Sequence, residues 1–344
     1  MSSKYDACAE LLQFPLIGDS VRFTCVIDPS RKVRVFDQQF PSPDVAFGRV
    51  QTNGVGDFCR WMLTDVALII RFLDGTYWAK ERPEGLFSGG SAYNRIFSFQ
   101  AGSADIIVVC MPPTVFVLRV SNGVVEEESL SISAHLYCGF GSSDAEYFLF
   151  GQSLRSDLGE SGQPLIASAK ADRFMVQDAT LDVGASIEGI MAALACNHSA
   201  TLICSESPPP LTMYDFEWDP SPGATDHENF WVVPWPKTGA VKPTRIEGVR
   251  YLGAGGVKGN QVSYFQDQKN RHGSDVASMI CISADGVPRY LNVQGLHRDS
   301  TIWKVQYDPL FGWLGVASEF SGTRDSHLML SKDGVEWASR RIDL

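Results

Sequence analysis

A two-residue turn signal returns along this chain at intervals of about 48 residues, each time between two alternating apolar runs. The last copy, LMLSKDGVEW, has its turn at Asp333-Gly334. The copy before it, ICISADGVPRY, has its turn at Asp285-Gly286. Asp-Gly between alternating apolar residues is the strongest short-range signal for a β-hairpin. Hairpins at such regular intervals restrict the possible folds more than any other feature of this sequence.

The series continues toward the N-terminus. Asn122-Gly123 lies 48 residues after Asp74-Gly75, and Asp28 lies 46 residues before Asp74. Each of these turns again separates short runs of strand-forming residues. The same supersecondary unit is therefore repeated through the first third of the chain as well.

Two weaker copies, near Asp172 and at the proline-rich stretch around Pro208, bring the number of repeats to seven. The last repeat alone holds four short antiparallel strands in about 45 residues, which is one blade of a β-propeller. The sequence therefore predicts an all-β fold, a single-domain β-propeller of seven blades with four antiparallel strands each. The predicted blades span residues 5–45, 46–84, 85–130, 131–182, 183–243, 244–295 and 296–344. The alternative is a two-domain β-sandwich protein with unrelated hairpins.

The turn residues have a predicted structural role. Glycine takes positive φ in such a turn at low cost, a neighbouring Ser or Asp side chain bonds turn amides, and a tryptophan covers the apolar side. The residues assigned this role are Asp28, Asp74, Gly75, Asn122, Gly123, Ser283, Asp285, Gly286, Ser331, Asp333, Gly334 and Trp337.

Composition excludes several classes of partner. The formal net charge is −11 at pH 7, and a basic face for a phosphate backbone is not expected from it. No apolar run reaches the eighteen residues of a membrane span, and the N-terminus lacks the features of a secretory signal. We therefore expect no nucleic acid partner and no membrane insertion. Eight cysteines without a CxxC pair predict reduced core thiols rather than disulfides.

One segment breaks the repeat. Residues 215–242 form an apparent insertion rich in acidic and aromatic residues. Aromatic side chains in a long surface loop are typical of a binding site. Trp218, Phe230, Trp231 and Trp235 are therefore predicted to contact a partner. The alternative is that Trp231 and Trp235 belong to the fourth strand of the fifth blade.

The motif Ser331-x-Asp333-Gly334-x-x-Trp337 resembles the Asp-box, or BNR repeat, of sialidase-like β-propellers of the kind found in bacteriophage tail and fibre proteins. The preceding IWKVQYDPLFGWLGVAS resembles the opening of such a blade. The resemblance implies a non-enzymatic structural or adhesion component of a phage virion, assembled in the host cytoplasm, or otherwise a cytoplasmic protein. Its expected partners are other virion proteins and a host-surface glycan or protein.

The resemblance also implies an alternative, a sialidase-like propeller that binds or cleaves glycans. That chemistry uses three arginines around a carboxylate, and Arg60, Arg71, Arg119 and Arg250 lie on or beside expected strands. An intracellular WD40-like scaffold is a further alternative, supported by a lone Trp218-Asp219 pair. We assign no catalytic residue, cofactor or metal site, and interpret Asp226-His227-Glu228 as a hydrated loop.

Overall fold

The structure is a computed structural model that describes residues 9, 12, 16–19, 23–27, 33–36, 50–64, 67–81, 95–143, 146–153, 164–170, 173–178, 187, 189–196, 199–206, 228–236, 242–257, 260–268, 275–319 and 326–342. No helix among these residues has the length and hydropathy needed to cross a bilayer.

The first half of the chain forms separate antiparallel sheets, in which neighbouring strands follow one another in sequence. A three-stranded sheet contains β1 (Leu16–Asp19), β2 (Phe23–Ile27) and β3 (Val33–Phe36). The next sheet contains β4 (Val50–Val55), β5 (Cys59–Thr64), β6 (Ala67–Phe72) and β7 (Tyr77–Glu81). A third contains β8 (Arg95–Ala101), β9 (Ala104–Met111), β10 (Thr114–Ser121) and β11 (Val124–Ser131). The fourth contains β12 (Ala134–Ser143), β13 (Glu146–Ser153), β14 (Pro164–Lys170) and β15 (Arg173–Asp178).

The second half is one continuous eleven-stranded sheet. Its first strands are β16 (Gly189–Cys196), β17 (Ser199–Ser205), β18 (Glu228–Trp235) and β19 (Thr244–Gly255). Next come β20 (Val262–Asp267), β21 (Val276–Ser283) and β22 (Pro288–His297). The last are β23 (Thr301–Asp308), β24 (Gly312–Ser318), β25 (Ser326–Ser331) and β26 (Trp337–Ile342).

Two strands make this sheet continuous. The first half of β19 pairs with β18, and its second half pairs with β20, so β19 ends one four-stranded unit and begins the next. The predicted boundary between residues 243 and 244 is therefore the start of a shared strand. The outer strands β22 and β26 pair in parallel at Val293–Trp337 and Gln294–Ala338. This pair joins the β19–β22 unit to the β23–β26 unit.

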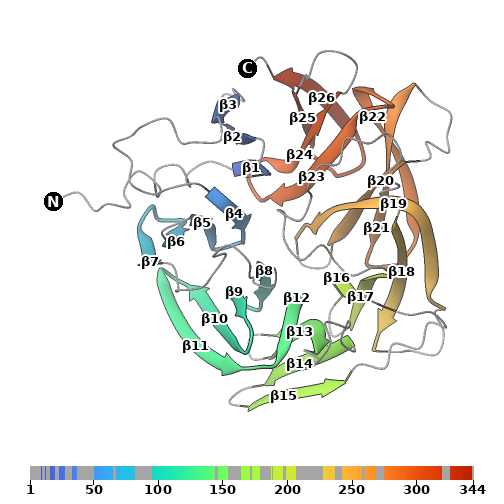
Figure 1. The fold of residues 1–344 in the computed structure, drawn as a ribbon. Coiled ribbons are helices and arrows are strands. Elements are labelled where there is room, and N and C mark those ends of the chain that lie inside the picture. Colours follow the sequence, from blue (N-terminus) through green and yellow to red (C-terminus); the bar gives the residue numbers. More distant parts are fainter. Residues whose placement is uncertain are drawn as a thin grey trace.

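The units are arranged in a ring around a common centre (Figure 1). The first strand of each unit lies innermost and contacts first strands of its neighbours, as β8 does with β4 and β12. At the seam of the ring, β1 contacts β4 on one side and β23 and β24 on the other. The prediction of an all-β propeller is confirmed. The described residues give six four-stranded units and the three-stranded β1–β3 unit, so seven four-stranded blades stays a prediction for the complete chain.

The core lies between adjacent units rather than inside any one of them. Strand β9 shows why, because its whole apolar run is buried. Ile106 and Val108 pack toward the β12–β15 unit, whereas Ile107 and Val109 pack toward the β4–β7 unit. Successive side chains of a strand point to opposite faces, so a sheet covered on both faces needs a continuous apolar run. Each unit therefore depends on its two neighbours for burial.

The chain differs from the sequence prediction in the fifth repeat. The connection expected at Pro208 joins the second and third strands of that unit, β17 and β18, rather than the third and fourth. The third and fourth strands, β18 and β19, are connected through residues 236–243 instead. Residues 207–227, which include Pro208 itself, lie outside the described part of the chain.

Candidate functional site

All the Asp-Gly turns emerge on one side of the ring. In an antiparallel meander of four strands, the first and third connections leave the sheet at the same end. The described connections on this side are residues 56–58, 73–76, 102–103, 122–123, 256–261, 284–287, 309–311 and 332–336, with residues 258 and 259 outside the described part. We call this side the turn face.

The turn at Asp333 is closed by its own side chains. The amides of Val335 and Glu336 donate to Asp333 Oδ1 at 2.8 and 2.9 Å. Ser331 Oγ donates to the same carboxylate oxygen and accepts from the Gly334 amide at 2.9 Å. Hydrogen bonds from the Glu336 and Val335 amides are the main reason that the pKa of Asp333 lies below its ordinary value.

Two aromatic residues hold the same turn from the apolar side. Trp337 Nε1 donates to the Gly334 carbonyl at 3.1 Å. Tyr264, from β20 of the neighbouring unit, donates its hydroxyl to that carbonyl at 2.7 Å. Gly334 has φ of 78°, which favours glycine. The turn therefore also connects the β19–β22 and β23–β26 units.

The Asp285 turn repeats the pattern without the tryptophan. Ser283 Oγ donates to Asp285 Oδ1 at 2.6 Å, and the Val287 amide donates to it at 3.0 Å. Gly286 has φ of 75°. Arg289 forms an exposed ion pair with Asp285 at 3.2 Å.

The earlier turns occupy the same connection of their units. Asp74 Oδ1 accepts from the Thr76 amide and hydroxyl at 2.9 and 2.6 Å, and Gly75 has φ of 91°. Asn122 and Gly123 have φ of 49° and 76°, and positive φ at both positions is the signature of a type I′ turn. Asp28 and Asp172 lie outside the described residues.

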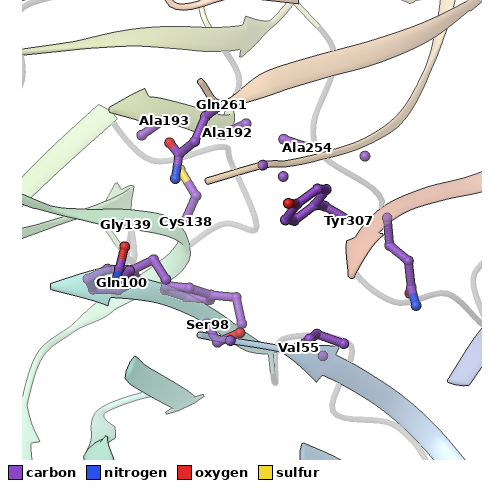
Figure 2. Close-up of a pocket in the computed structure, with 18 of the residues that line it drawn as sticks. Val55, Ser98, Gln100, Cys138, Gly139, Ala192, Ala193, Ala254, Gln261 and Tyr307 are labelled. Carbon is purple, nitrogen blue, oxygen red and sulfur yellow. The ribbon is translucent and has the colours of Figure 1, made fainter. Parts of the chain in front are cut away.

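A cavity of about 330 Å³ lies at the centre of the ring. Its lining comes mainly from the innermost strands β4, β8, β12, β16, β19 and β23, whose side chains Figure 2 shows around one common space. Tyr307 places an aromatic ring in it, and Ser98 and Gln100 place polar groups opposite. Gln261, across the cavity, uses Oε1 to accept from the Ala195 amide at 2.7 Å. The cavity thus combines apolar walls with a few polar groups, which is typical of a small-molecule site.

A buried carboxylate supports the rim of this cavity. Asp105 is 1% exposed and accepts from the amides of Asp57, Phe58 and Cys59 at 2.8 to 3.0 Å. These amides belong to the first turn of the preceding unit. Burial raises the pKa of Asp105 to about 6, against the turn amides, which lower it. The residue therefore fixes one unit to the next and titrates in an accessible pH range.

A second buried carboxylate connects units on either side of the ring's seam. Asp308 is fully buried and bonds Arg60 Nη2 at 3.0 Å. It also accepts from the amides of Leu310 and Phe311 at 2.9 and 3.1 Å. Arg60 belongs to β5 and Asp308 ends β23, so the pair spans the β1–β3 unit. Arg60 also donates to the carbonyl of buried Leu12 at 3.5 Å.

A groove of about 640 Å³ runs on the turn face between the last two units. Its sides are the Asp285 turn with Val257 and the Asp333 turn with Val335. Tyr264, Cys281 and Trp313 lie along it and are buried. The groove shares Gly256, Gln261 and Tyr307 with the central cavity, so the two hollows adjoin.

Exposed apolar side chains gather on the turn face. Of the eight large hydrophobic residues exposed in the described part of the chain, six lie in or beside its turns. These six are Leu73, Val124, Val257, Val287, Leu310 and Val335. The other two are Met175 on β15 and Tyr290 on β22. Single exposed hydrophobic residues are normal, but their concentration on one side indicates a contact surface.

The aromatic residues of the predicted insertion do not form an exposed loop. Phe230, Trp231 and Trp235 lie in β18, a strand with neighbours on both sides. Phe230 is fully buried, and its predicted role as a partner contact is wrong because it fills the core between two units. Trp231 is half-buried and donates Nε1 to Glu206 at 2.7 Å. Trp218 lies outside the described residues.

The arginines considered for sialidase chemistry do not converge. Arg60 and Arg71 face each other across β5 and β6, and Arg60 is held by Asp308. Arg119 lies on β10, and Arg250 lies over the ring of Trp303 at 4.7 Å. Among the described residues that line the central cavity, Lys304 is the one basic side chain. The described residues also contain no group of three or more His, Cys, Asp or Glu side chains placed to hold a metal, while Asp226 and His227 lie outside them.

Sequence reasoning missed the residues that connect the units. Asp105 appears in the sequence as a single acidic residue before the apolar run IIVVC, and Asp308 as part of an Asp-Pro turn. Both partners of Asp308 and Asp105 are far away in the chain. Only the acidic residue at the edge of a buried strand signalled that a polar partner must exist.

No protein-family model and no curated protein matches this chain. Among solved structures, it is similar to a triple arginine-to-alanine mutant of AofleA from Arthrobotrys oligospora, with 8% identity, 85% of this chain and 86% of that chain covered, and a TM-score of 0.46. For YCF48 bound to D1 peptide the values are 11%, 88%, 82% and 0.44. For the WD40 domain of SCAP from fission yeast they are 8%, 97%, 88% and 0.43. Likeness this low says nothing about what the chain binds.

Proposed function

We propose that this chain is a non-enzymatic binding propeller whose turn face docks onto a partner protein. The observation that carries the proposal is the set of exposed apolar side chains on that face, defined above. They sit on turns held by a rigid scaffold of paired strands, the arrangement in which loops usually carry binding residues. Their positions in different units give a broad contact area rather than a single point.

The more specific part of the proposal is a role as a structural or adhesion component of a phage tail or fibre complex. Its support is the Ser331-x-Asp333-Gly334-x-x-Trp337 turn, which resembles that of virion propellers. An intracellular WD40-like scaffold would use the same face and differ in its partner. The two proposals are separated by asking whether the chain associates with assembled particles.

The test is co-sedimentation of purified chain with virions. We compare the wild type with a variant carrying Leu73→Ser, Val124→Ser and Leu310→Ser. An apolar anchor at an interface is typically worth about 2 kcal/mol, so the triple variant should lose most of its binding. Met175→Ser is the matched control, because Met175 is 59% exposed but lies away from the turns. Failure of the wild type to associate would reject the virion role, and equal binding of the triple variant would reject the turn face.

Glycan binding is the second candidate function, favoured by the central cavity. Tyr307, Ser98 and Gln100 combine an aromatic ring with hydroxyl and amide groups, which suits a sugar. Glycan-array binding that is lost in Gln100→Ala would support it. Hydrolysis of a fluorogenic sialoside would support the sialidase-like form of this function.

A further inference from the structure

The groove between the last two units has properties that the rest of the turn face lacks. It is long enough, at about 640 Å³, to hold several residues of another chain. Val257 and Val335, at its two sides, are 42% and 50% exposed, so both leave apolar surface open to solvent. Between them lie the buried side chains of Tyr264, Cys281 and Trp313.

The aromatic rings of the groove do not offer a stacking platform. Tyr264 and Trp313 pack edge to face, with ring centroids 4.8 Å apart, and both are buried. Tyr307 packs against the other side of Trp313 in the same manner. A sugar stacks on an exposed ring face, whereas an inserted aliphatic or aromatic side chain needs only an apolar slot. The groove therefore suits an inserted side chain better than a glycan.

The charges along the groove favour an anion beside that side chain. The carboxylates of Asp285 and Asp333 already accept hydrogen bonds from their own turns. The ammonium of Lys332 forms no hydrogen bond or ion pair with the described residues, and the Arg289 side chain is 61% exposed and paired only at Nη2. Two cations with donors to spare can receive a carboxylate from a partner.

We propose that this groove binds an extended segment of a partner protein in which one large apolar side chain lies next to a carboxylate. The inference deepens the proposed docking function, and it names where on the turn face the partner is recognised and by what chemistry. The apolar side chain enters between Val257 and Val335, and the carboxylate meets Lys332 and Arg289.

Short fluorescein-labelled peptides test the proposal. Two probes contain Phe-Asp or Asp-Phe between Gly-Ser spacers, and matched peptides replace Phe with Ser or Asp with Asn. Fluorescence anisotropy with the full chain should show saturable binding of at least one probe at up to about millimolar concentration, the weak end of specific recognition. Removing the Phe should abolish it, and Asp to Asn should weaken it by about 10-fold.

Variants locate the binding. Val335→Glu and Lys332→Glu should each weaken binding by about 10-fold or more, because one blocks the apolar side and the other reverses a cation. Val124→Glu is the matched control, since Val124 is 54% exposed beside the equivalent turn of the β8–β11 unit and lies outside the groove. Lys332 is an exposed surface residue, so its variant keeps the test valid should Val335→Glu fold poorly.

Several outcomes would overturn the inference: no binding of either probe, equal binding of the peptides without Phe, or equal binding by Val335→Glu and Lys332→Glu. Should that happen while virion association still depends on Leu73, Val124 and Leu310, the docking function stands and the groove is excluded. Conversely, peptide binding in the groove without virion association would support this inference and reject the virion role.

Discussion

At the scale of single residues, two glycines with nearly the same backbone conformation have very different surroundings. Gly286 and Gly334 have φ of 75° and 78°. A Cβ on Gly286 would meet only Val232 Cγ1, at 3.5 Å. A Cβ on Gly334 would collide with the Tyr264 hydroxyl and the Trp313 indole. The first glycine is needed for its conformation, and the second is needed for its size as well.

This contrast gives a matched pair of substitutions. Gly286→Ala should cost about 1 kcal/mol of unfolding free energy, the strain of a left-handed alanine. Gly334→Ala should cost about 3 kcal/mol or more, because the collision adds to the same strain. Urea denaturation of both variants measures the difference. Equal losses would show that Tyr264 and Trp313 move aside without cost.

Two ion pairs of this chain differ in burial and should differ in energy. Arg60→Met leaves Asp308 buried without its cation and should cost about 3 kcal/mol. Arg289→Met breaks an exposed pair with Asp285 and should cost at most about 1 kcal/mol. Chemical denaturation measures both. A small loss for Arg60→Met would mean that the Leu310 and Phe311 amides are enough to hold the Asp308 carboxylate.

The pH dependence of stability should carry the signature of Asp105. Burial raises its pKa from 3.8 to about 6, so its contribution to stability is fully present below pH 3.8 and is lost as the pH rises through 6. A shift of this size corresponds to about 3 kcal/mol. The difference in unfolding free energy between wild type and Asp105→Asn should therefore change, to the disadvantage of the wild type, by that order between pH 4 and pH 7. A constant difference would indicate that the turn amides keep Asp105 ionised throughout.

At the scale of elements, β18 shows how a strand can be mistaken for a loop. Its sequence, ENFWVVPW, begins with polar residues and contains Pro234, which argues against a strand with neighbours on both sides. Pro234 lies near the end of the strand, opposite Thr201 of β17. The pairing is decided by β17 and β19, which lie far from it in sequence, so no local pattern predicts it.

The side chain of Trp235 tests this assignment. Its ring lies 4.8, 5.5 and 5.9 Å from the ring centroids of Phe148, Phe150 and Phe140 in the β12–β15 unit. Trp235→Ala should cost about 3 kcal/mol, since it removes aromatic packing between two units. Tyr290→Ala, at an exposed aromatic residue of β22, should stay within about 0.5 kcal/mol. Thermal unfolding that does not distinguish them would return Trp235 to the surface.

What sequence could predict is set by the range of the interactions concerned. The Asp333 turn was predictable, because Ser331, Gly334 and Trp337 all act within a few residues of it. Tyr264, which binds the same turn from 70 residues away, was not. The candidate groove was beyond reach for the same reason. It exists only because ring geometry brings the Asp285 and Asp333 turns side by side, although each turn was found separately.

At the scale of the whole molecule, the two halves are built differently. Strands of the first half form separate sheets that touch through side chains, whereas β16 to β26 form one hydrogen-bonded sheet. The parallel pair between β22 and β26 closes that sheet at its outer edge. Local opening should therefore be easier in the first half, where each sheet can separate without breaking backbone hydrogen bonds to its neighbour.

Buried thiols report this difference. Cys59 and Cys110 lie in separate sheets of the first half, and Cys204 and Cys281 lie in the continuous sheet; all four are free and buried. Under native conditions with excess thiol reagent, Cys204 and Cys281 should react together and more slowly than the other two. The same reagent in denaturant should find nearly all eight cysteines free. Equal native rates for the four would mean that the ring opens only as a whole.

The seam of the ring has a consequence for how the protein is made. Strand β1 is covered by β23 and β24, which a ribosome adds almost 300 residues later. At about 5 to 20 residues per second, the first strands wait roughly 15 to 60 s for the strands that cover them. From β4 onward, each unit can pack on the one translated just before it. Translation order and spatial order therefore agree around the ring except at this seam, where the nascent chain has most need of a chaperone.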